Sequence, residues 1–436
     1  MLAFNMKVTD KAHLTKILTQ HVDKDKWPAG VSFVQELEGW RERMRDANYK
    51  ANGAEECRDI MLSYYKLATQ ASFHFQSMNL ATNKISFRWH DTFSPSVSIS
   101  QSDWQYERAC TLFNVAAAIS YMATCQDRGD LVGIKTACYF FQQAAGTVAK
   151  MREVCKGASW LERTPDMMME FLEALESLML AQAQKCFFEK AVGDGMKDVL
   201  IAKIAAECAA LYEDTAVRLS TPRLKEACAK DWIEVVEWNR KLFDGMQHYY
   251  ASVAHAERKE FGQQVSRLAH ATNMCAEAVI LCQKASPVLQ EQFKRAHKMA
   301  KEAWSKAKND NDLVYNDKVP PVQTLPKVER KAIVRPLALT ELEVPNPVIK
   351  PPPAVADPPP AVAVPTPTPS PPSDSMAELS VTSSNAMPPP PSFAEAEEAA
   401  IAELVSMGFA MEAARAALHK ANGSVEQATE YLLSGA

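Results

Sequence analysis

This chain of 436 residues contains little glycine. It lacks cysteine pairs of the metal-binding type and long apolar runs. Because there are only 14 glycines, few positions favour helix breaks or tight turns, and the sequence favours long helices. The ten cysteines, scattered from Cys57 to Cys282, show no C-x-x-C pair and no Cys/His spacing typical of zinc. We therefore expect free buried thiols in a reducing cytosol, and no metal site.

Targeting and catalytic signals are missing too. The first residues lack the apolar core of a signal peptide, Leu2 excludes N-myristoylation, and no apolar run reaches the ~18 residues of a membrane span. There is no phosphate-cradling H-C-x5-R loop, no G-x-S-x-G motif and no P-loop. We expect a cytoplasmic protein with no enzyme activity and no cofactor, whose membrane contacts are peripheral.

Proline and acidic residues are concentrated in one part of the chain. Of the 26 prolines, 18 lie between Pro336 and Pro391. From Glu341 onward there are 12 acidic and 3 basic residues, which leaves 41 acidic and 45 basic residues before it. A body so close to neutral gives no case for binding nucleic acid.

Most of residues 32–308 show apolar positions three and four apart, which indicates helices. One exception is the stretch 84–100, where alternating Ile85, Phe87 and Trp89 predict a strand or short hairpin. Long helices joined by short turns predict an all-α antiparallel solenoid. Since no strict repeat period is visible, an ordinary helical bundle is the alternative.

One helix boundary is predicted in detail. Thr164-Pro165-Asp166 is typical of a helix start, because Thr can cap, Pro fits the first position and Asp faces the positive end of the dipole. The apolar pattern that follows ends near Gly193, and a second helix runs from about Met196 past Leu211.

Residues 341–393 have the composition of a polyproline-II linker between a body and a tail. If extended, roughly fifty residues at about 3.1 Å each reach on the order of 150 Å. Proline-rich segments can also dock into aromatic-lined grooves of partner proteins. We expect three parts: a body (1–340), the linker (341–393) and a C-terminal domain (394–436).

Three short helices are predicted after the linker, over 396–406, over 412–420 and from Ser424 to Leu433. Ser424 and Gln427 form a capping box for the third. With a Met407-Gly408-Phe409 loop after the first helix and Leu432-Leu433 at the end of the third, this stretch resembles the ubiquitin-associated (UBA) domain.

The UBA resemblance implies a ubiquitin-binding surface made by the loop and the end of the third helix. The residues that it assigns to this surface are Met407, Gly408, Phe409, Leu432 and Leu433. Alternatively, Met407 and Leu433 are core residues of a very small domain. A surface of this size should bind weakly and act through avidity.

Several stretches of the body are similar to the Alix-type Bro-one domain, in order and over nearly the whole of 1–340. They are Trp104 to Arg108, Leu112 to Ala117, Met179 to Phe188, Met196 to Asp198, Ile201 to Lys203 and Asp310 to Pro320. The resemblance implies a curved helical solenoid with a TPR-like core and a small β hairpin. It also implies that the concave face binds the C-terminal amphipathic helix of an ESCRT-III subunit, a charged multivesicular body protein.

The positions that match the apolar groove of that family are Phe187, Leu200 and Ile204, flanked by Lys135. Leu200 and Ile204 stand four apart on one helical stripe, and of the adjacent Phe187 and Phe188 one can face a groove. Such a stripe is also typical of a buried core. Leu131 stands where the family can carry an acidic residue, so the rim of the groove is expected to differ.

The expected function is therefore that of an accessory adaptor in endosomal, multivesicular-body sorting, recruited peripherally to endosomes. The alternative is a membrane-shaping scaffold that binds anionic lipid through basic helices. The basic residues in question are Arg41, Arg43 and Arg45, and a second group at Lys294, Arg295, Lys298, Lys301, Lys306 and Lys308.

Overall fold

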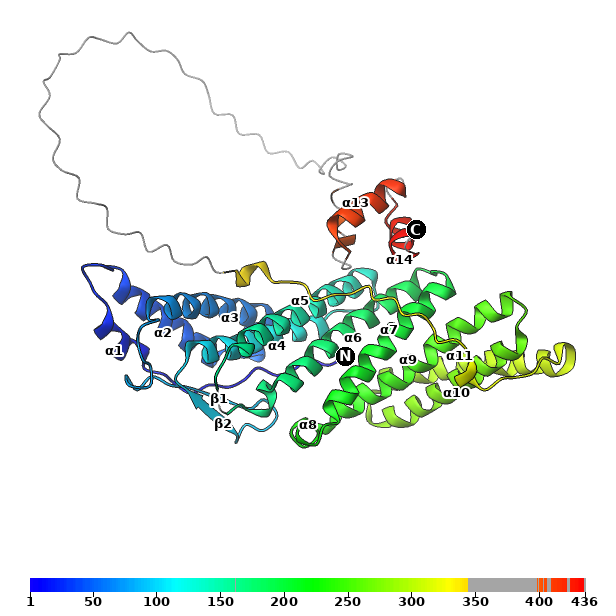
Figure 1. Cartoon of the computed structure of the whole chain (residues 1–436), viewed down its shortest axis with the longest axis horizontal. Helices are drawn as coiled ribbons and strands as arrows, with labels where there is room; N and C mark the ends of the chain where they lie inside the picture. Colours follow the sequence, from blue (N-terminus) through cyan, green and yellow to red (C-terminus); the bar gives the residue numbers. More distant parts are fainter. Residues whose placement is uncertain are drawn as a thin grey trace, which may run out of the picture.

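Long helices joined by short turns make up most of the computed structural model (Figure 1). The structure describes residues 1–160, 162–343, 398, 400–402, 404–405, 409–421 and 424–434, without the side chains of 426, 430, 433 and 434. The elements of the body are α1 (Leu14–Leu18), α2 (Gly30–Asp46), α3 (Tyr49–His74), β1 (Phe87–His90), β2 (Ser98–Gln101), α4 (Trp104–Thr124), α5 (Leu131–Lys156), α6 (Met169–Gly193), α7 (Asp198–Leu219), α8 (Pro222–Ala227), α9 (Lys230–Glu257), α10 (Phe261–Leu281) and α11 (Pro287–Asp310). Further along, α13 spans Met411–Lys420 and α14 spans Val425–Ser434.

The long helices of the body form a solenoid, because each packs mainly on its neighbours in the chain. The sequence of pairs runs from α2 on α3 through α4, α5, α6 and α7, and then through α9, α10 and α11. Figure 1 shows these helices side by side along the length of the body, with α1 and α2 at one end and α10 and α11 at the other. The prediction of an all-α solenoid is confirmed.

The predicted hairpin is also present. Strands β1 and β2 pair antiparallel, with Phe87 opposite Gln101 and Trp89 opposite Ile99. Thr9 of the N-terminal segment bridges to Trp89 on its other side. Phe87 and Trp89 are buried while the residue between them is exposed, as alternation requires.

A buried carboxylate joins four elements of the body. Glu107 of α4 accepts hydrogen bonds from Arg41 of α2 (2.8 Å), Tyr64 of α3 (2.7 Å) and Trp89 of β1 (2.6 Å). A buried charge is tolerated only when it is paired and hydrogen-bonded, and here both oxygens of Glu107 have donors. This network fixes the hairpin against α2, α3 and α4.

The predicted start of α6 is wrong by four residues. The chain makes a 3-10 turn over Pro165–Met167, and the α-helix begins at Met169. The reason is that Thr164 does not cap the helix: its hydroxyl donates to the Asp166 carboxylate (2.6 Å), which also pairs with Lys7. The predicted end near Gly193 is confirmed.

After α11 the chain turns back over the solenoid as an extended segment, residues 326–343, which we call the strap. It runs in the opposite direction to the solenoid, from α10 towards α3 (Figure 1). At its start Arg267 of α10 donates to the carbonyl of Pro326 (2.7 Å), and the amide of Lys331 then donates to the carbonyl of Lys203 in α7 (3.1 Å).

Two buried glutamines hold the middle of the strap. The Gln184 side chain in α6 donates to the Lys331 carbonyl (2.9 Å) and accepts from the Ile333 amide (3.2 Å). The Gln142 side chain in α5 accepts from the Arg335 amide (3.1 Å). An extended chain has no internal partners for its backbone groups, so these side chains replace the missing strand neighbour.

The ten cysteines are free, and all but Cys125 are buried. Burial raises the pKa of the Cys138 thiol to about 12 and that of Cys155 to about 11. Such thiols stay protonated near neutral pH and act as small apolar groups of the core.

None of the helices that the structure describes is long and apolar enough to cross a membrane.

Candidate functional site

The four groove residues expected from the sequence lie on three consecutive helices of the solenoid. Lys135 is in the second turn of α5, Phe187 in the second half of α6, and Leu200 and Ile204 in the first half of α7. Helices α5, α6 and α7 pack in that order, and the Gln184 side chain of α6 contacts the Ile204 carbonyl at 3.5 Å. The fold therefore gathers these positions in one region.

Their exposure differs from the expectation. Phe187 is 1% exposed and Ile204 is 0% exposed, so both belong to the core. Phe188 is half-buried and packs edge-on against Phe243 of α9, with ring centroids 5.2 Å apart. The expectation that Phe187 and Ile204 line an open groove does not agree with this burial, and their part in binding stays a prediction.

Leu200 and Lys135 are only half-buried and can meet a partner. On α5, exposed Leu131 (44%) and Tyr139 stand four residues before and after Lys135, which puts the three on one stripe. Val132 beside Leu131 is 73% exposed. We call Leu131, Lys135, Tyr139 and Leu200 the α5–α7 face.

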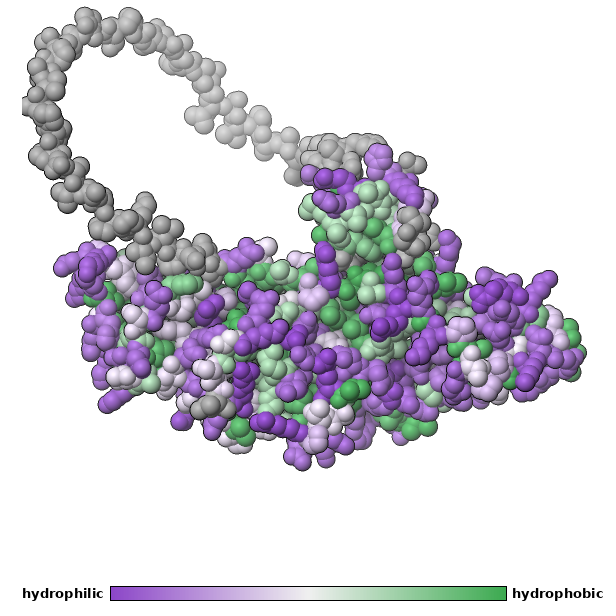
Figure 2. Space-filling view, in the orientation of Figure 1, coloured by the Kyte–Doolittle hydropathy of each residue, from purple (hydrophilic) through white to green (hydrophobic). Residues whose placement is uncertain are grey.

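Further exposed valines stand close to this face in the chain, Val192 near the end of α6 and Val199 beside Leu200. Figure 2 shows hydrophobic residues gathered over the middle of the body, whereas its two ends are mainly hydrophilic. A cluster of exposed apolar residues is typical of an interaction surface. Sequence reasoning missed Tyr139, Val192 and Val199, because periodicity alone does not show which apolar residues stay uncovered.

The strap lies beside the α5–α7 face. Gln142 and Gly146 follow Lys135 by seven and eleven residues, so they continue the same side of α5, and the strap covers them. On α7 the strap's Glu329 pairs with Lys203 (2.6 Å), one turn after Leu200. Leu131 and Tyr139 of α5 stay exposed beside the strap.

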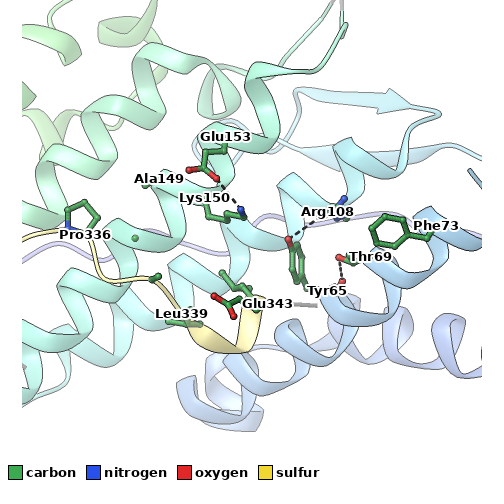
Figure 3. Close-up of a pocket in the computed structure, with 13 residues that line it drawn as sticks. Tyr65, Thr69, Phe73, Arg108, Ala149, Lys150, Glu153, Pro336, Leu339 and Glu343 are labelled. Carbon is green, nitrogen blue, oxygen red and sulfur yellow. Dashed lines mark hydrogen bonds and ion pairs between the residues drawn. The ribbon is translucent and has the colours of Figure 1, made fainter. Parts of the chain in front are cut away.

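A separate pocket of about 570 Å³ lies between α3, α4, α5 and the end of the strap (Figure 3). Arg108 donates to the Tyr65 hydroxyl at 3.4 Å, and Lys150 pairs with Glu153 at 3.0 Å on its wall. Leu339 of the strap closes one side. None of the residues expected at either binding site lines this pocket.

The C-terminal module has the predicted second and third helices as α13 and α14. The Ser424 side chain accepts from the Gln427 amide (3.3 Å), which is the first half of the predicted capping box. Leu404, Ala414 and Leu418 are buried between the helices.

The expected ubiquitin-binding residues are only partly described. Met407 and Gly408 lie outside the described residues, as does the side chain of Leu433. Phe409 and Leu432 are half-buried, and the Phe409 amide donates to the Leu404 carbonyl (3.3 Å). Both side chains can therefore offer apolar surface to a partner.

Residues 1–355 match the BRO1-like domain, and residues 396–432 match the UBA/TS-N domain. The chain belongs to the BRO1-like domain family. It carries a C-terminal UBA domain in addition.

Relatives of this BRO1-like chain include "ALG-2 interacting protein X" of Dictyostelium discoideum, 30% identical over 353 residues, which are 80% of this chain and 44% of that protein. The vacuolar-sorting protein BRO1 of Arabidopsis thaliana is 28% identical over 78% of this chain and 41% of its own length. The chain thus spans less than half the length of these relatives.

A solved complex of the ALIX BRO1 domain with CHMP4C has the same fold. It matches with a TM-score of 0.68 and 25% identity, over 79% of this chain and 98% of that one. The match confirms the curved helical BRO1 architecture.

The two basic clusters of the lipid-binding alternative differ in the structure. Arg41 is buried against Glu107 and cannot meet lipid, whereas Arg43 is exposed and stacks on Trp40. On α11 the basic residues are exposed, but Arg295 and Lys298 stand 3.6 and 3.9 Å from neighbouring carboxylates. Such pairs lower the positive potential that anionic lipid would meet.

Proposed function

We propose that this chain is a non-enzymatic adaptor of endosomal sorting, cytoplasmic and recruited peripherally to endosomes. Its body binds the C-terminal amphipathic helix of an ESCRT-III subunit, and its UBA domain binds ubiquitin or ubiquitinated cargo. The observation that carries the proposal is the α5–α7 face, which keeps exposed apolar residues on a BRO1-like fold. A solved relative of this fold is a complex with CHMP4C, which supports an ESCRT-III partner.

An amphipathic helix fits the α5–α7 face chemically. Such helices dock by placing apolar residues three and four apart into an apolar surface. Leu131, Tyr139 and Leu200 offer that surface, and the Lys135 ammonium suits an acidic residue at the edge of the partner helix. Phe187 and Ile204 then support the face from beneath instead of touching the partner.

For the tail we propose the ubiquitin-binding residues implied by the UBA match: Met407, Gly408, Phe409, Leu432 and Leu433. Binding to one ubiquitin should be weak, since the module is small. The division proposed is a body of 1–340, a proline-rich tether of 341–393 and the UBA domain in 394–436. A tether raises the effective concentration of cargo beside the filament and compensates for weak binding.

The adaptor role is tested by asking whether the chain links an ESCRT-III helix to ubiquitin. Beads carrying an ESCRT-III C-terminal helix are incubated with the full chain and with ubiquitin chains, and retained ubiquitin is measured. We expect retention by the wild type and a loss for Phe409→Ala, while the amount of adaptor on the beads stays unchanged. As a control, Met411→Ala changes an exposed residue of α13 and should retain ubiquitin. No retention by the wild type, or full retention by a folded Phe409→Ala protein, contradicts the proposal.

A further inference from the structure

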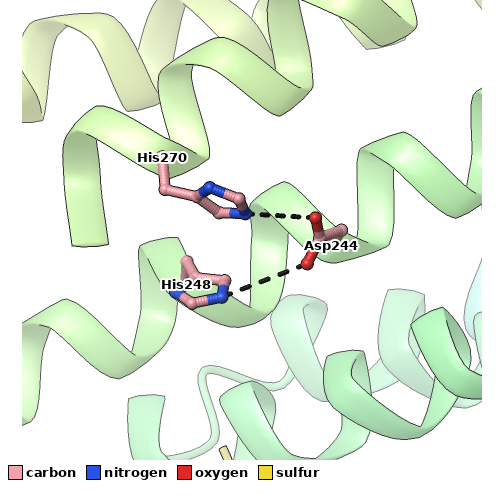
Figure 4. A group of neighbouring side chains, drawn as sticks. All are labelled: Asp244, His248 and His270. Atoms are coloured by element: carbon pink, nitrogen blue, oxygen red, sulfur yellow. Dashed lines mark hydrogen bonds and ion pairs between the residues drawn. The ribbon is translucent and has the colours of Figure 1, made fainter. Parts of the chain in front are cut away.

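Two histidines and a carboxylate converge between α9 and α10, far along the chain from both proposed binding sites (Figure 4). Asp244 and His248 are one turn apart on α9, and His270 faces them from α10. The His270 Nε2 atom lies 3.1 Å from one carboxylate oxygen of Asp244, and the His248 Nε2 atom lies 4.0 Å from the other.

These three side chains offer one ligand atom each, all within 4.8 Å of one another. Imidazole nitrogen with one carboxylate oxygen is a donor set that zinc and other first-row divalent ions prefer. A residue pair at i and i+4 on one helix places both ligands on the same side, and the third ligand comes from the facing helix. All three side chains are partly exposed, so an ion and its waters can enter.

We propose that Asp244, His248 and His270 form a binding site for a divalent first-row transition ion such as Zn²⁺, with solvent completing the coordination. The ion links α9 to α10 and so stabilises the part of the solenoid that bears α11 and the start of the strap. The proposal is independent of ESCRT-III and ubiquitin binding.

The hydrogen bond between Arg267 and His248 opposes metal binding. Arg267 lies 3.2 Å from His248 Nδ1, and the same guanidinium donates to His255 (2.8 Å) and to the Pro326 carbonyl (2.7 Å). When Nδ1 accepts from Arg267, the ring proton is on Nε2. Coordination through Nε2 therefore requires the other neutral tautomer of His248, in which the ring proton sits on Nδ1 and displaces the Arg267 contact. Because that hydrogen bond is lost, we expect modest affinity.

The test is titration of the full chain with Zn²⁺ by calorimetry, together with thermal melts with and without the ion. Every protein carries Cys125→Ser, because Cys125 is an exposed thiol that can bind zinc by itself. We expect one ion per chain and an upward shift of Tm. His270→Gln keeps a side-chain N–H for Asp244 but removes the imidazole, and should weaken binding at least tenfold and abolish the Tm shift.

His297→Gln, on α11, is the matched control and should bind as the wild type does. If metal-free His270→Gln melts well below the wild type, Asp244→Asn replaces it, since an amide at this position keeps an oxygen acceptor for Gln247 (2.8 Å). Absence of binding to the wild type overturns the site. Equal binding by folded variants of Asp244 or His270 overturns it as well.

Discussion

Phe187 and Leu200 sit on adjoining helices of the same face but differ in what surrounds them. Phe187 is enclosed by the core, whereas Leu200 keeps part of its surface in solvent. Truncating a fully buried aromatic side chain leaves a cavity, while truncating a half-exposed leucine removes fewer contacts.

We predict that Phe187→Ala lowers the free energy of unfolding by about 3–5 kcal/mol. Leu200→Ala should lower it by roughly 1 kcal/mol, because much less apolar surface leaves the core. Urea denaturation followed by circular dichroism measures both values. Equal costs for the two variants would contradict the assignment of Phe187 to the core and Leu200 to the surface.

Lys7 and Asp166 form a buried ion pair. Burial raises the pKa of Asp166, but the charge of Lys7 and hydrogen bonds from Lys7, Thr164 and Thr92 outweigh it and hold the pKa below its ordinary value. The neighbouring Asp91 has a raised pKa, because of burial and the charge of Asp166. Asp166 is therefore the carboxylate that stays ionised.

A carboxylate with a lowered pKa in the folded state stabilises the fold above its unfolded pKa, near 3.9, and this stabilisation is lost as the pH falls through the folded pKa. Asp166→Asn leaves the Lys7 charge without its partner and should cost about 3–5 kcal/mol at pH 7. The difference from wild type should shrink below about pH 4. Melts of both proteins between these pH values check this, and a constant difference would disprove the ion-pair account.

The strap is the element of the body that the sequence patterns do not predict. It is held by backbone hydrogen bonds to Gln142 and Gln184 and by close approach at Gly146. A Cβ atom at Gly146 would lie 1.9 Å from the Leu337 carbonyl oxygen, a distance that no relaxation of a flexible side chain can relieve. Gly39 of α2, in contrast, has open space around the position of its Cβ.

We predict that Gly146→Ala lowers stability, since the strap must shift, whereas Gly39→Ala raises it by up to about 1 kcal/mol, because alanine is the better helix former. Chemical denaturation compares the two variants directly. Hydrogen exchange of the strap amides should accelerate in Gly146→Ala alone. If both alanines stabilise the protein, the strap does not pack on α5 as described.

Sequence patterns predict the elements whose signal is local. The alternation at Ile85, Phe87 and Trp89 predicts the hairpin, and the Ser424 capping box predicts the start of α14. The start of α6 is missed because Asp166 is recruited by Lys7, which is 159 residues away in the sequence. The strap is missed because it has no apolar periodicity and its partners are glutamines inside other helices.

The residues proposed to bind partners can be predicted from the sequence only in part, because packing decides which of them are exposed and which come together. Periodicity places Leu200 and Ile204 on one stripe, but only packing decides that Ile204 is covered while Leu200 stays accessible. Likewise Asp244 and His248 form a pair that the sequence shows, whereas His270 joins them only through the packing of α9 on α10. The spacing of Cys and His residues along the sequence does not reveal this cluster of one carboxylate and two histidines.

Along the sequence, a proline-rich stretch separates the BRO1-like body from the C-terminal UBA domain. We propose one partner for each domain. The proposed binding of an ESCRT-III amphipathic helix to the α5–α7 face matters most, because the other proposed roles depend on where the body is anchored.

The most direct test is fluorescence anisotropy of a labelled ESCRT-III C-terminal helix titrated with the full chain. Leu200→Asp puts a charge on the α5–α7 face, and Val217→Asp is the control on an exposed apolar residue of the same helix. We predict that Leu200→Asp weakens binding at least about tenfold while Val217→Asp binds as the wild type does. Unchanged binding by a folded Leu200→Asp protein would contradict the claim.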